Sequence, residues 1–408
     1  FFFCWKIQED MGELVDYSST MNQLEDDEEC ISDGSVDVED ELANWHVLSE
    51  DVGNEVEERG YASDPCPSRS FTPKASVILT SNLFQNTKGR LYNAVRDTSK
   101  PIKFKTTVPV YVLGTSYMAL DKGRNVNNAE LTIHEPEFGL LMSMIYSQIW
   151  LTYRSGFTPL HNSNMKTDMG WGCMIRSLQM MIARGLLNIK AGRNVFPVNI
   201  DIYRDTLHHF VDVDKPHHML SIHNIIKEAH YFGLKAGEWF DPSRACSVFK
   251  NLVCKSLDRD FSIAVFTDSC IHSDIILKQA KLDGQEHDID FMPTIILLPT
   301  RIAEITIPEY MLSQLKFCLL NEHTLGFVGG FGNTASYFIG FQENEFIALD
   351  PHHVHPANET RKKVYHCKYP RKINADRIDP SIALGFIVTS ENELELLVNQ
   401  IETYNKDH

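Results

Sequence analysis

One stretch, residues 167–187 (TDMGWGCMIRSLQMMIARGLL), constrains the fold more than any other part of the chain. Apolar residues recur in it at the spacing of a single helical face: Met174, Leu178, Met181, Ile182 and Gly185. This spacing predicts a helix that begins at or just before Cys173. Because Gly170 and Gly172 allow backbone angles that are closed to other residues, we expect a sharp turn that delivers Cys173 to the first turn of a buried helix.

The position of Cys173 makes it a candidate nucleophile. Unpaired N–H groups and the positive end of the helix dipole favour a thiolate at a helix N-terminus, and they lower the thiol pKa from ~8.5 towards neutrality. The alternative is a small apolar residue that fills a core helix. The choice between the two depends on whether the chain also supplies a base.

A candidate base follows in residues 325–356. There LGFVGG predicts an apolar strand, GFGNTAS a flexible loop, and SYFIGFQENEFIALD a hairpin with its turn at 342–345. A residue before proline is extended, so Asp350 and His352 on either side of Pro351 should project to the same side, roughly 6.6 Å apart. The carboxylate could then hold the imidazole as a general base. The alternative is an Asp-Pro turn with a solvated histidine.

The rest of the chain predicts a mixture of helices and strands. Strands are expected at 107–113, 262–266 and 293–299, and helices at 136–154 and 309–320. Residues 201–250 read as mostly helical, with breaks at Gly233, Gly237 and Pro242. Residues 76–85 form a further apolar stretch.

The N-terminal region has a different composition. Residues 1–64 hold 20 Asp and Glu against 2 Lys and Arg, a net of −18, and the rest of the chain carries +1, so this region accounts for the formal net charge of −17. Such a segment repels itself and has little apolar surface to bury, so we expect residues 1–72 to be a disordered acidic tail. No basic patch indicates nucleic acid, and no apolar run has the length of a signal peptide or a membrane span.

The nine cysteines are scattered and form no CxxC pair, which favours free thiols in a reducing cytosol over a disulfide framework. A zinc site is the alternative use of such residues. One stretch is dense enough for it: His352, His353, His355, His366 and Cys367. It lacks finger or HExxH spacing, so we expect no metal and no cofactor.

Several segments together resemble the autophagins, the cytosolic cysteine proteases of autophagy. They are TDMGWGCMIRSLQMM, SQIWLTYRSGF, AGEWFDPS, GFVGGFGNTASYFIGFQENEFIALDPHHVHP and SIALGFIVTSENELELL, which run in the family's order from about Pro109 to Tyr404. The resemblance implies a papain-like α/β (α+β) catalytic domain at 73–404, with a smaller inserted subdomain at roughly 190–290. It also implies a cytoplasmic enzyme that contacts autophagosomal membranes through its substrate.

The substrate implied by the resemblance is the ubiquitin-like modifier of autophagosomal membranes. Such enzymes cut the modifier precursor after a C-terminal glycine and later release the modifier from phosphatidylethanolamine. When the catalytic roles of the family are carried over residue by residue, Cys173 attacks, His352 acts as base and acid, and Asp350 orients His352. Tyr153 matches the tyrosine whose hydroxyl forms the oxyanion hole with the Cys173 N–H. Without the resemblance, Tyr153 would be interpreted as a buried aromatic residue.

The resemblance also implies a gate over the cleft. Trp239 matches the family's covering tryptophan, whose alternative role is a core anchor, and the mobile partner would be the loop at 329–335. This loop departs from the family, which often has Lys or Arg and then Pro after the two glycines. Here the residues are Gly329, Gly330, Phe331 and Gly332. Loss of the proline should loosen the loop, and Phe331 should add an apolar contact.

The segment after His352 departs from the family as well, because His353 and His355 stand where the family has a polar run. Spacing from Asp350 favours His352 as the base.

Three function classes are compatible with these residues: a thiol peptidase, favoured by the Cys, Asp and His set; a modifier-binding protein with weak or lost catalysis; and a zinc hydrolase using the 352–367 cluster.

The acidic tail contains one apolar cluster, Asn44 to Leu48. Trp45 lies three positions before Leu48 and follows several carboxylates, an arrangement that resembles the short modifier-interacting motifs of autophagy proteins. An extended peptide of this kind can add a strand to an exposed sheet edge and place both side chains in apolar pockets. The alternative is that the two residues are incidental or dock on the enzyme itself.

Overall fold

The computed structural model describes residues 4–5, 89–93, 102–105, 108–117, 135–257, 259–332, 334–359 and 362–407. The predicted motif at Trp45 and Leu48 and the apolar stretch at 76–85 lie outside these ranges. Most of the predicted tail does too. Within that tail, Cys4–Trp5 forms strand β1, which pairs in parallel with β6 (Cys270–Ile271).

The helices and strands alternate irregularly along the chain. The other strands are β2 (Val110–Val112), β3 (Thr115–Tyr117), β4 (Tyr153–Ser155), β5 (Ser262–Val265), β7 (Thr294–Arg301), β8 (Thr324–Phe331), β9 (Thr334–Gln342), β10 (Glu345–Leu349), β11 (Val354–Pro356), β12 (Arg371–Asn374) and β13 (Ser381–Val388). The helices are α3 (Glu135–Tyr146), α4 (Cys173–Ala191), α5 (Ile200–His208), α6 (Ile222–Ala229), α7 (Pro242–Lys255), α8 (Ser273–Glu286), α9 (Glu309–Leu320) and α10 (Glu391–Asp407). Short 3₁₀ helices are η3 (His230–Phe232), η4 (Lys362–Tyr365) and η5 (Ala375–Arg377).

One large mixed sheet organises these elements. Its strands run in the order β12, β10, β9, β8, β13, β7, β5, and β2 joins it through β9. The pairings are antiparallel except for β5 with β7, which are parallel. A separate parallel pair, β4 with β11, lies outside this sheet and matters for the site.

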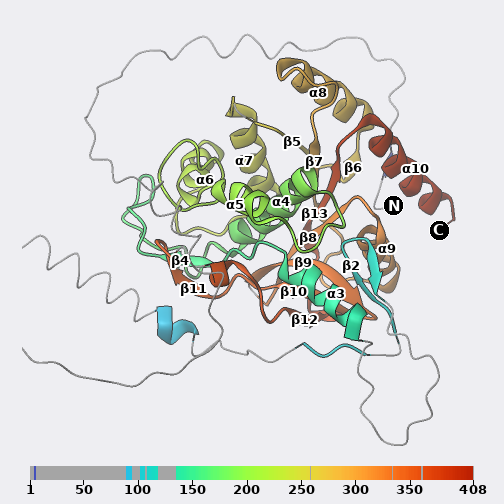
Figure 1. Cartoon of the computed structure of the whole chain (residues 1–408), viewed down its shortest axis with the longest axis horizontal. Coiled ribbons are helices and arrows are strands. Elements are labelled where there is room, and N and C mark those ends of the chain that lie inside the picture. Colours follow the sequence, from blue (N-terminus) through green and yellow to red (C-terminus); the bar gives the residue numbers. More distant parts are fainter. Residues whose placement is uncertain are drawn as a thin grey trace, which may run out of the picture. The chain divides into compact units, whose positions relative to one another are not determined.

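Both faces of the sheet are buried, because side chains alternate along each strand and both sets are apolar. In β7, Ile295 and Leu297 belong to one hydrophobic cluster and Ile296 and Leu298 to another. Helices α3 to α7 supply residues to the first cluster, and α8, α9 and α10 supply residues to the second. The sheet therefore lies between two layers of helices (Figure 1).

Helix α4 lies against β8 and β9 near the middle of the sheet (Figure 1). It is buried around its whole circumference from Cys173 to Asn188, including Arg176 and Gln179. Gly185 allows a close approach to β7 as well, since a Cβ there would lie 2.6 Å from Cδ1 of Ile295. The packing fixes the position of the helix N-terminus and of Cys173.

Two predicted elements have different bounds. The helix expected at 136–154 ends at Tyr146, because the chain beyond it turns to pair with β11 and the N–H of Trp150 donates to the carbonyl of Tyr365 (2.8 Å). The loop expected at GFGNTAS is mostly strand. Phe331 pairs with Thr334, so only a tight turn joins β8 and β9.

The mixture of helices around a sheet confirms the predicted α/β class. Residues 190–290 contribute α5 to α8 together with β5, which joins the main sheet, while the predicted subdomain boundaries stay a prediction. No helix in the described ranges combines the length and apolar composition needed to cross a bilayer.

Candidate active site

The turn before α4 places Cys173 at the first helical position. Gly170 has φ +91, a left-handed angle that favours glycine, and the carbonyl of Asp168 accepts the N–H groups of Trp171 (3.2 Å) and Gly172 (2.9 Å). Gly172 has an ordinary φ of −83 and is needed for space instead, since a Cβ would lie 2.7 Å from that of Asp168. No side chain caps this end of α4. Its first N–H groups can therefore face a substrate.

A buried ion network holds the same turn. The Asp168 carboxylate accepts the N–H of Arg154 (2.6 Å) and Nε of Arg176 (2.6 Å), and the side chains of Asp168 and Arg176 are both fully buried. Arg176 Nη2 also contacts the Asp212 carboxylate at 3.0 Å. These pairings keep the pKa of Arg176 above its usual range: burial lowers it, and the two carboxylates raise it by more. The sequence patterns did not reveal this network.

The parallel pairing of β4 with β11 brings Tyr153 beside His352. Tyr153 pairs with Val354, and its N–H donates to the carbonyl of Pro351 (3.1 Å). The ring centroids of Tyr153 and His352 lie 5.3 Å apart at an interplanar angle of 90°. Residues some 200 positions apart in the chain are thereby placed side by side.

His352 is held by Asp350, as the geometry of the Asp-Pro-His triplet predicts. Oδ1 of Asp350 accepts the His352 N–H at 3.0 Å and also forms a short contact with Nδ1 of the ring. The other carboxylate oxygen contacts Arg371 Nη1, and the Asp350 carbonyl accepts the indole N–H of Trp150 (2.9 Å). Arg371, which comes from β12, is a contributor that the sequence analysis missed. Ion pairs across such a distance in sequence leave no local pattern.

The thiol and the imidazole interact electrostatically. Burial raises the pKa of Cys173, but the hydrogen bond and positive charge of His352 outweigh it, assisted by the Ala335 N–H and the Tyr153 hydroxyl, so the thiol pKa is lowered. Burial lowers the pKa of His352, whereas Asp350 and then Cys173 raise it by more. Nε2 of His352, the ring nitrogen that does not contact Asp350, makes no hydrogen bond among the described residues, so it is available to exchange a proton with the thiol. The pair therefore favours a thiolate beside an imidazolium.

The neighbouring groups keep the charge states that this pair needs. Burial raises the pKa of Asp350, but His352 and Arg371 lower it well below the usual range, so Asp350 stays ionised. Burial and the adjacent Cys173 raise the pKa of Tyr153 far above its ordinary value. The phenol therefore remains a neutral hydrogen-bond donor beside the sulfur.

The thiol is covered in this structure. Only 2% of Cys173 and 3% of His352 is exposed, and strands β8 and β9 pack against α4. Of the predicted gate residues, Gly329, Gly330 and Phe331 lie in β8 and are buried, and Gly332 forms the turn with φ +54. The β8–β9 hairpin, not an open loop, thus lies against the thiol. Its Phe331 packs beneath Arg371, whose guanidinium lies 5.5 Å from the ring centroid.

Trp239 lies between η3 and α7 and is 44% exposed, which excludes the alternative of a core anchor. It follows Gly237 (φ +92), where a Cβ would lie 2.8 Å from Cε of Met165. Met165 belongs to the segment that leads into the Cys173 turn. Trp239 is thus an exposed aromatic residue on a segment in contact with the approach to α4.

The described side chains of 352–367 do not converge on one point, as the alternative of a zinc site would require. Among the described residues, one group of three or more possible ligands converges, and it lies elsewhere, at His208, His217 and His218. His352 contacts Asp350, and His353 and His355 pack against the ring of Trp150, with centroids 5.2 and 6.3 Å away. His366 bonds the Tyr146 carbonyl through Nδ1 (2.7 Å). These contacts separate the side chains that zinc would have to gather.

Comparison with known proteins places this site in a family. The model of the Peptidase C54 catalytic domain matches residues 140–400, more than half of the chain. The chain is 28% identical over 333 residues to the cysteine protease ATG4B of Xenopus laevis, covering 74% of this chain and 82% of that protein. It is 26% identical over 335 residues to ATG4B of Gallus gallus (73% and 81%), and 29% identical over 282 residues to ATG4A of Oryza sativa subsp. japonica (61% and 58%). The chain therefore belongs to the Peptidase C54 family, the autophagins, and is a cysteine protease of autophagy.

Proposed function

We propose that the protein cleaves the autophagy ubiquitin-like modifier after its C-terminal glycine, and that it also releases the modifier from phosphatidylethanolamine. The observation that carries the proposal is the set of groups that act on one thiol: Cys173 stands at the start of α4, and His352 and the Tyr153 hydroxyl lower its pKa. Both substrates are amides of the same glycine carboxyl group. One acyl-transfer site can therefore serve both.

The reaction follows from the positions of these groups. The Cys173 thiolate attacks the glycine carbonyl carbon, and the negative charge that develops on its oxygen is met by the Tyr153 hydroxyl and the Cys173 N–H. The His352 imidazolium gives its proton to the leaving amine, which departs as the C-terminal peptide or as the lipid. A thioester remains. Neutral His352 then takes a proton from water, whose oxygen attacks the thioester; sulfur leaves as the thiolate beside the His352 imidazolium, and the glycine carboxyl group is released and ionises in water.

Selectivity for glycine is proposed to come from the cover over Cys173. Because Cys173 is buried and the β8–β9 hairpin packs against α4, a substrate must displace the turn between β8 and β9 before it can reach the thiol. A backbone without side chains could pass between this hairpin and Trp239, whereas any side chain would collide with the cover. The turn residue Gly332 can absorb such a change in backbone angles.

Two further expectations concern the location of the protein and a second binding motif. Cys173, Cys246, Cys254, Cys318 and Cys367 are free thiols, which supports a reducing, cytoplasmic location, and membrane contact is proposed to be made through the lipid-linked substrate. Trp45 and Leu48 are proposed to bind the mature modifier by strand addition. A peptide of residues 36–52 should bind it, and the same peptide with Trp45→Ala and Leu48→Ala should not. Equal binding of both peptides would remove this motif.

The activity is tested by incubating the protein with a modifier precursor that carries residues beyond its glycine, and with lipid-linked modifier on vesicles. Mass measurement should show cleavage directly after the glycine in the first case and unmodified mature modifier in the second. Cys173→Ser is the matched control and should leave both substrates intact. Cleavage at any other bond, or cleavage by the control, would contradict the proposal.

A further inference from the structure

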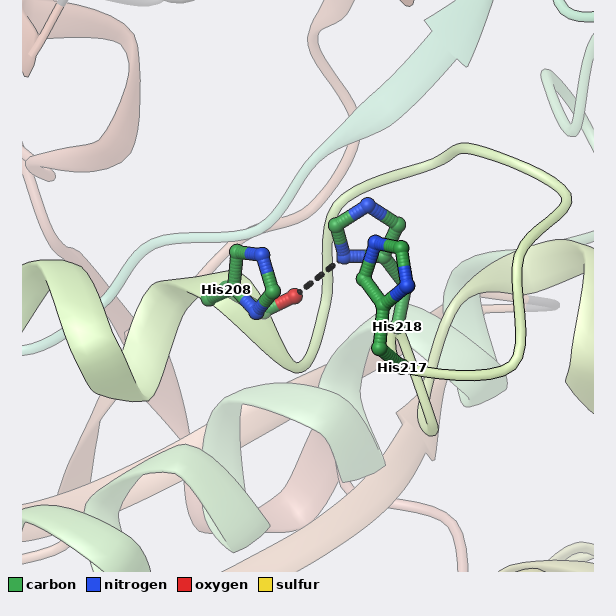
Figure 2. Close-up of side chains that lie close together, drawn as sticks. All are labelled: His208, His217 and His218. Atoms are coloured by element: carbon green, nitrogen blue, oxygen red, sulfur yellow. Dashed lines mark hydrogen bonds between the residues drawn. The ribbon is translucent and has the colours of Figure 1, made fainter. Parts of the chain in front are cut away.

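Three imidazole side chains gather away from the candidate active site, where α5 ends. His208 is the last residue of α5, and His217 and His218 lie on the loop that leads to α6 (Figure 2). One nitrogen from each ring lies within 4.8 Å of the other two. The ring centroids of His217 and His218 are 4.2 Å apart, and those of His208 and His218 4.5 Å. Neither the proposed catalysis nor the family comparison uses these residues.

His218 is oriented by its surroundings. Its side chain is almost fully buried, and Nδ1 lies 2.8 Å from the His208 carbonyl oxygen, the contact drawn in Figure 2. A carbonyl only accepts, so Nδ1 carries the proton and the neutral ring keeps the lone pair on Nε2. Metal-binding histidines are typically held in this way, through the nitrogen that does not bind the ion. The loop backbone is fixed as well, because Asn224 Nδ2 donates to the carbonyls of Lys215 and His218, each at 3.0 Å.

The ligand atoms that the cluster offers, three imidazole nitrogens, decide which cations it suits. Neutral imidazole nitrogens prefer zinc, copper and nickel to calcium or magnesium, which prefer oxygen.

We propose that His208, His217 and His218 bind one divalent transition metal ion, with Zn²⁺ as the ion that fits them best. Zinc takes imidazole nitrogens at about 2.05 Å in a tetrahedron, which places the nitrogens about 3.3 Å apart. The rings must therefore close by rotation. His217 is exposed and free to make that movement, whereas buried His218 provides the fixed ligand. Three protein ligands leave the fourth position for water or an external donor.

Binding would tie the loop at 209–221 to the end of α5. This loop carries Asp212, which pairs with Arg176, and its Leu220 carbonyl accepts Nε2 of Gln179 (2.7 Å). Both partners lie on α4, so the metal would stabilise the support of the catalytic helix without touching Cys173. The expected effect is a higher unfolding temperature at saturating zinc, because an ion that binds the folded chain shifts the equilibrium towards it.

The experiment measures zinc binding in a Cys173→Ser background, which removes the one reactive thiol that could bind zinc at the active site. The full chain is prepared without a histidine tag, stripped with chelator, and titrated with Zn²⁺ by calorimetry and by thermal unfolding. His217→Ala is the main variant because His217 is exposed and its loss should not disturb folding. His161→Ala is the matched control: His161 is also exposed and lies beside a second imidazole, His230, at 5.8 Å between centroids.

We expect one Zn²⁺ per chain and a rise in unfolding temperature in the background protein and in the His161→Ala control. His217→Ala should weaken binding by at least about tenfold, since even outer partners of metal ligands contribute about 10–100-fold. Cobalt added in place of zinc should give the visible absorption of a tetrahedral site in the background protein and in the His161→Ala control, but not in His217→Ala. No binding in the background protein, or binding that His217→Ala leaves unchanged, would overturn the proposal.

Discussion

The ion network below the Cys173 turn gives a quantitative prediction for Asp168→Asn. The Asp168 carboxylate is fully buried and accepts two donors at 2.6 Å, the N–H of Arg154 and Nε of Arg176. An amide of the same shape keeps one acceptor oxygen and loses the charge. Breaking a buried ion pair by removing one partner costs about 3–5 kcal/mol, because the remaining charge is left uncompensated.

Arg176 keeps one carboxylate in this variant, since Asp212 still contacts Nη2 at 3.0 Å. We therefore expect the lower end of that range, about 3 kcal/mol of unfolding free energy, or more than about a 100-fold change in the unfolding equilibrium. The unfolding temperature should fall by about 5–10 °C. Proteolytic activity should fall as well, because the carboxylate ties the turn that presents Cys173 to Arg154 and Arg176.

Urea unfolding followed by fluorescence measures the free energy of unfolding. If the dependence of this free energy on urea concentration has the same slope in both proteins, the variant differs in stability alone. Asp201→Asn is the matched control. Its carboxylate is 82% exposed and lies 3.7 Å from Arg204, so its removal should change the free energy by about 0.5 kcal/mol or less. A cost below about 1 kcal/mol for Asp168→Asn would refute the reasoning that the buried pair supports the turn.

The other predictions concern the catalytic groups. Cys173→Ser and His352→Ala should each lower the cleavage rate by about 10⁴-fold or more while the circular dichroism spectrum stays that of the folded protein; wild-type rates in either would end the assignment. Tyr153→Phe should lower kcat by about 10²–10³-fold, because it removes one donor to the oxyanion; a change in KM alone would show that the hydroxyl serves binding only. Trp239→Ala should relax discrimination between glycine and alanine before the scissile bond, measured as the ratio of the two kcat/KM values; an unchanged ratio would exclude Trp239 from the gate. The pH profile of kcat/KM should have an acid limb set by the Cys173 thiol and a basic limb set by the His352 imidazolium. His352 lowers the thiol pKa despite burial, so the acid limb should lie below the ordinary thiol pKa. Asp350 raises the imidazole pKa despite burial, so the basic limb should lie above the ordinary imidazole pKa. Because Asp350→Asn removes that carboxylate, its basic limb should move to lower pH; an unmoved limb would show that another group sets it.

Local patterns predicted much of this fold. Helix α9 has the predicted bounds, α4 begins at Cys173, and the turn between β9 and β10 lies inside the predicted 342–345. In each case the signal is contained within the segment, as apolar periodicity, a glycine turn or a polar break between two strands.

The errors lie where distant segments decide the structure. Nothing within 147–155 shows that β4 will pair with β11, so the apolar run after Tyr146 was predicted to continue the helix. The glycines near 330 read as a loop, whereas pairing with β9 and β13 extends β8 to Phe331. Arg371 was missed for the same reason, because its contact with Asp350 depends on the pairing of β12 with β10.

The identity of the nucleophile is tested most directly by trapping it. A mature modifier whose C-terminal carboxyl group is replaced by a thiol-reactive electrophile should form one covalent adduct, and peptide mapping should place it on Cys173. The chain offers a real alternative, since Cys254 is exposed whereas Cys173 is buried beneath the β8–β9 hairpin. We predict labelling of Cys173 alone, its loss in Cys173→Ser, and slow labelling in His352→Ala. Labelling of Cys254, or equal labelling of Cys173→Ser, would contradict the account.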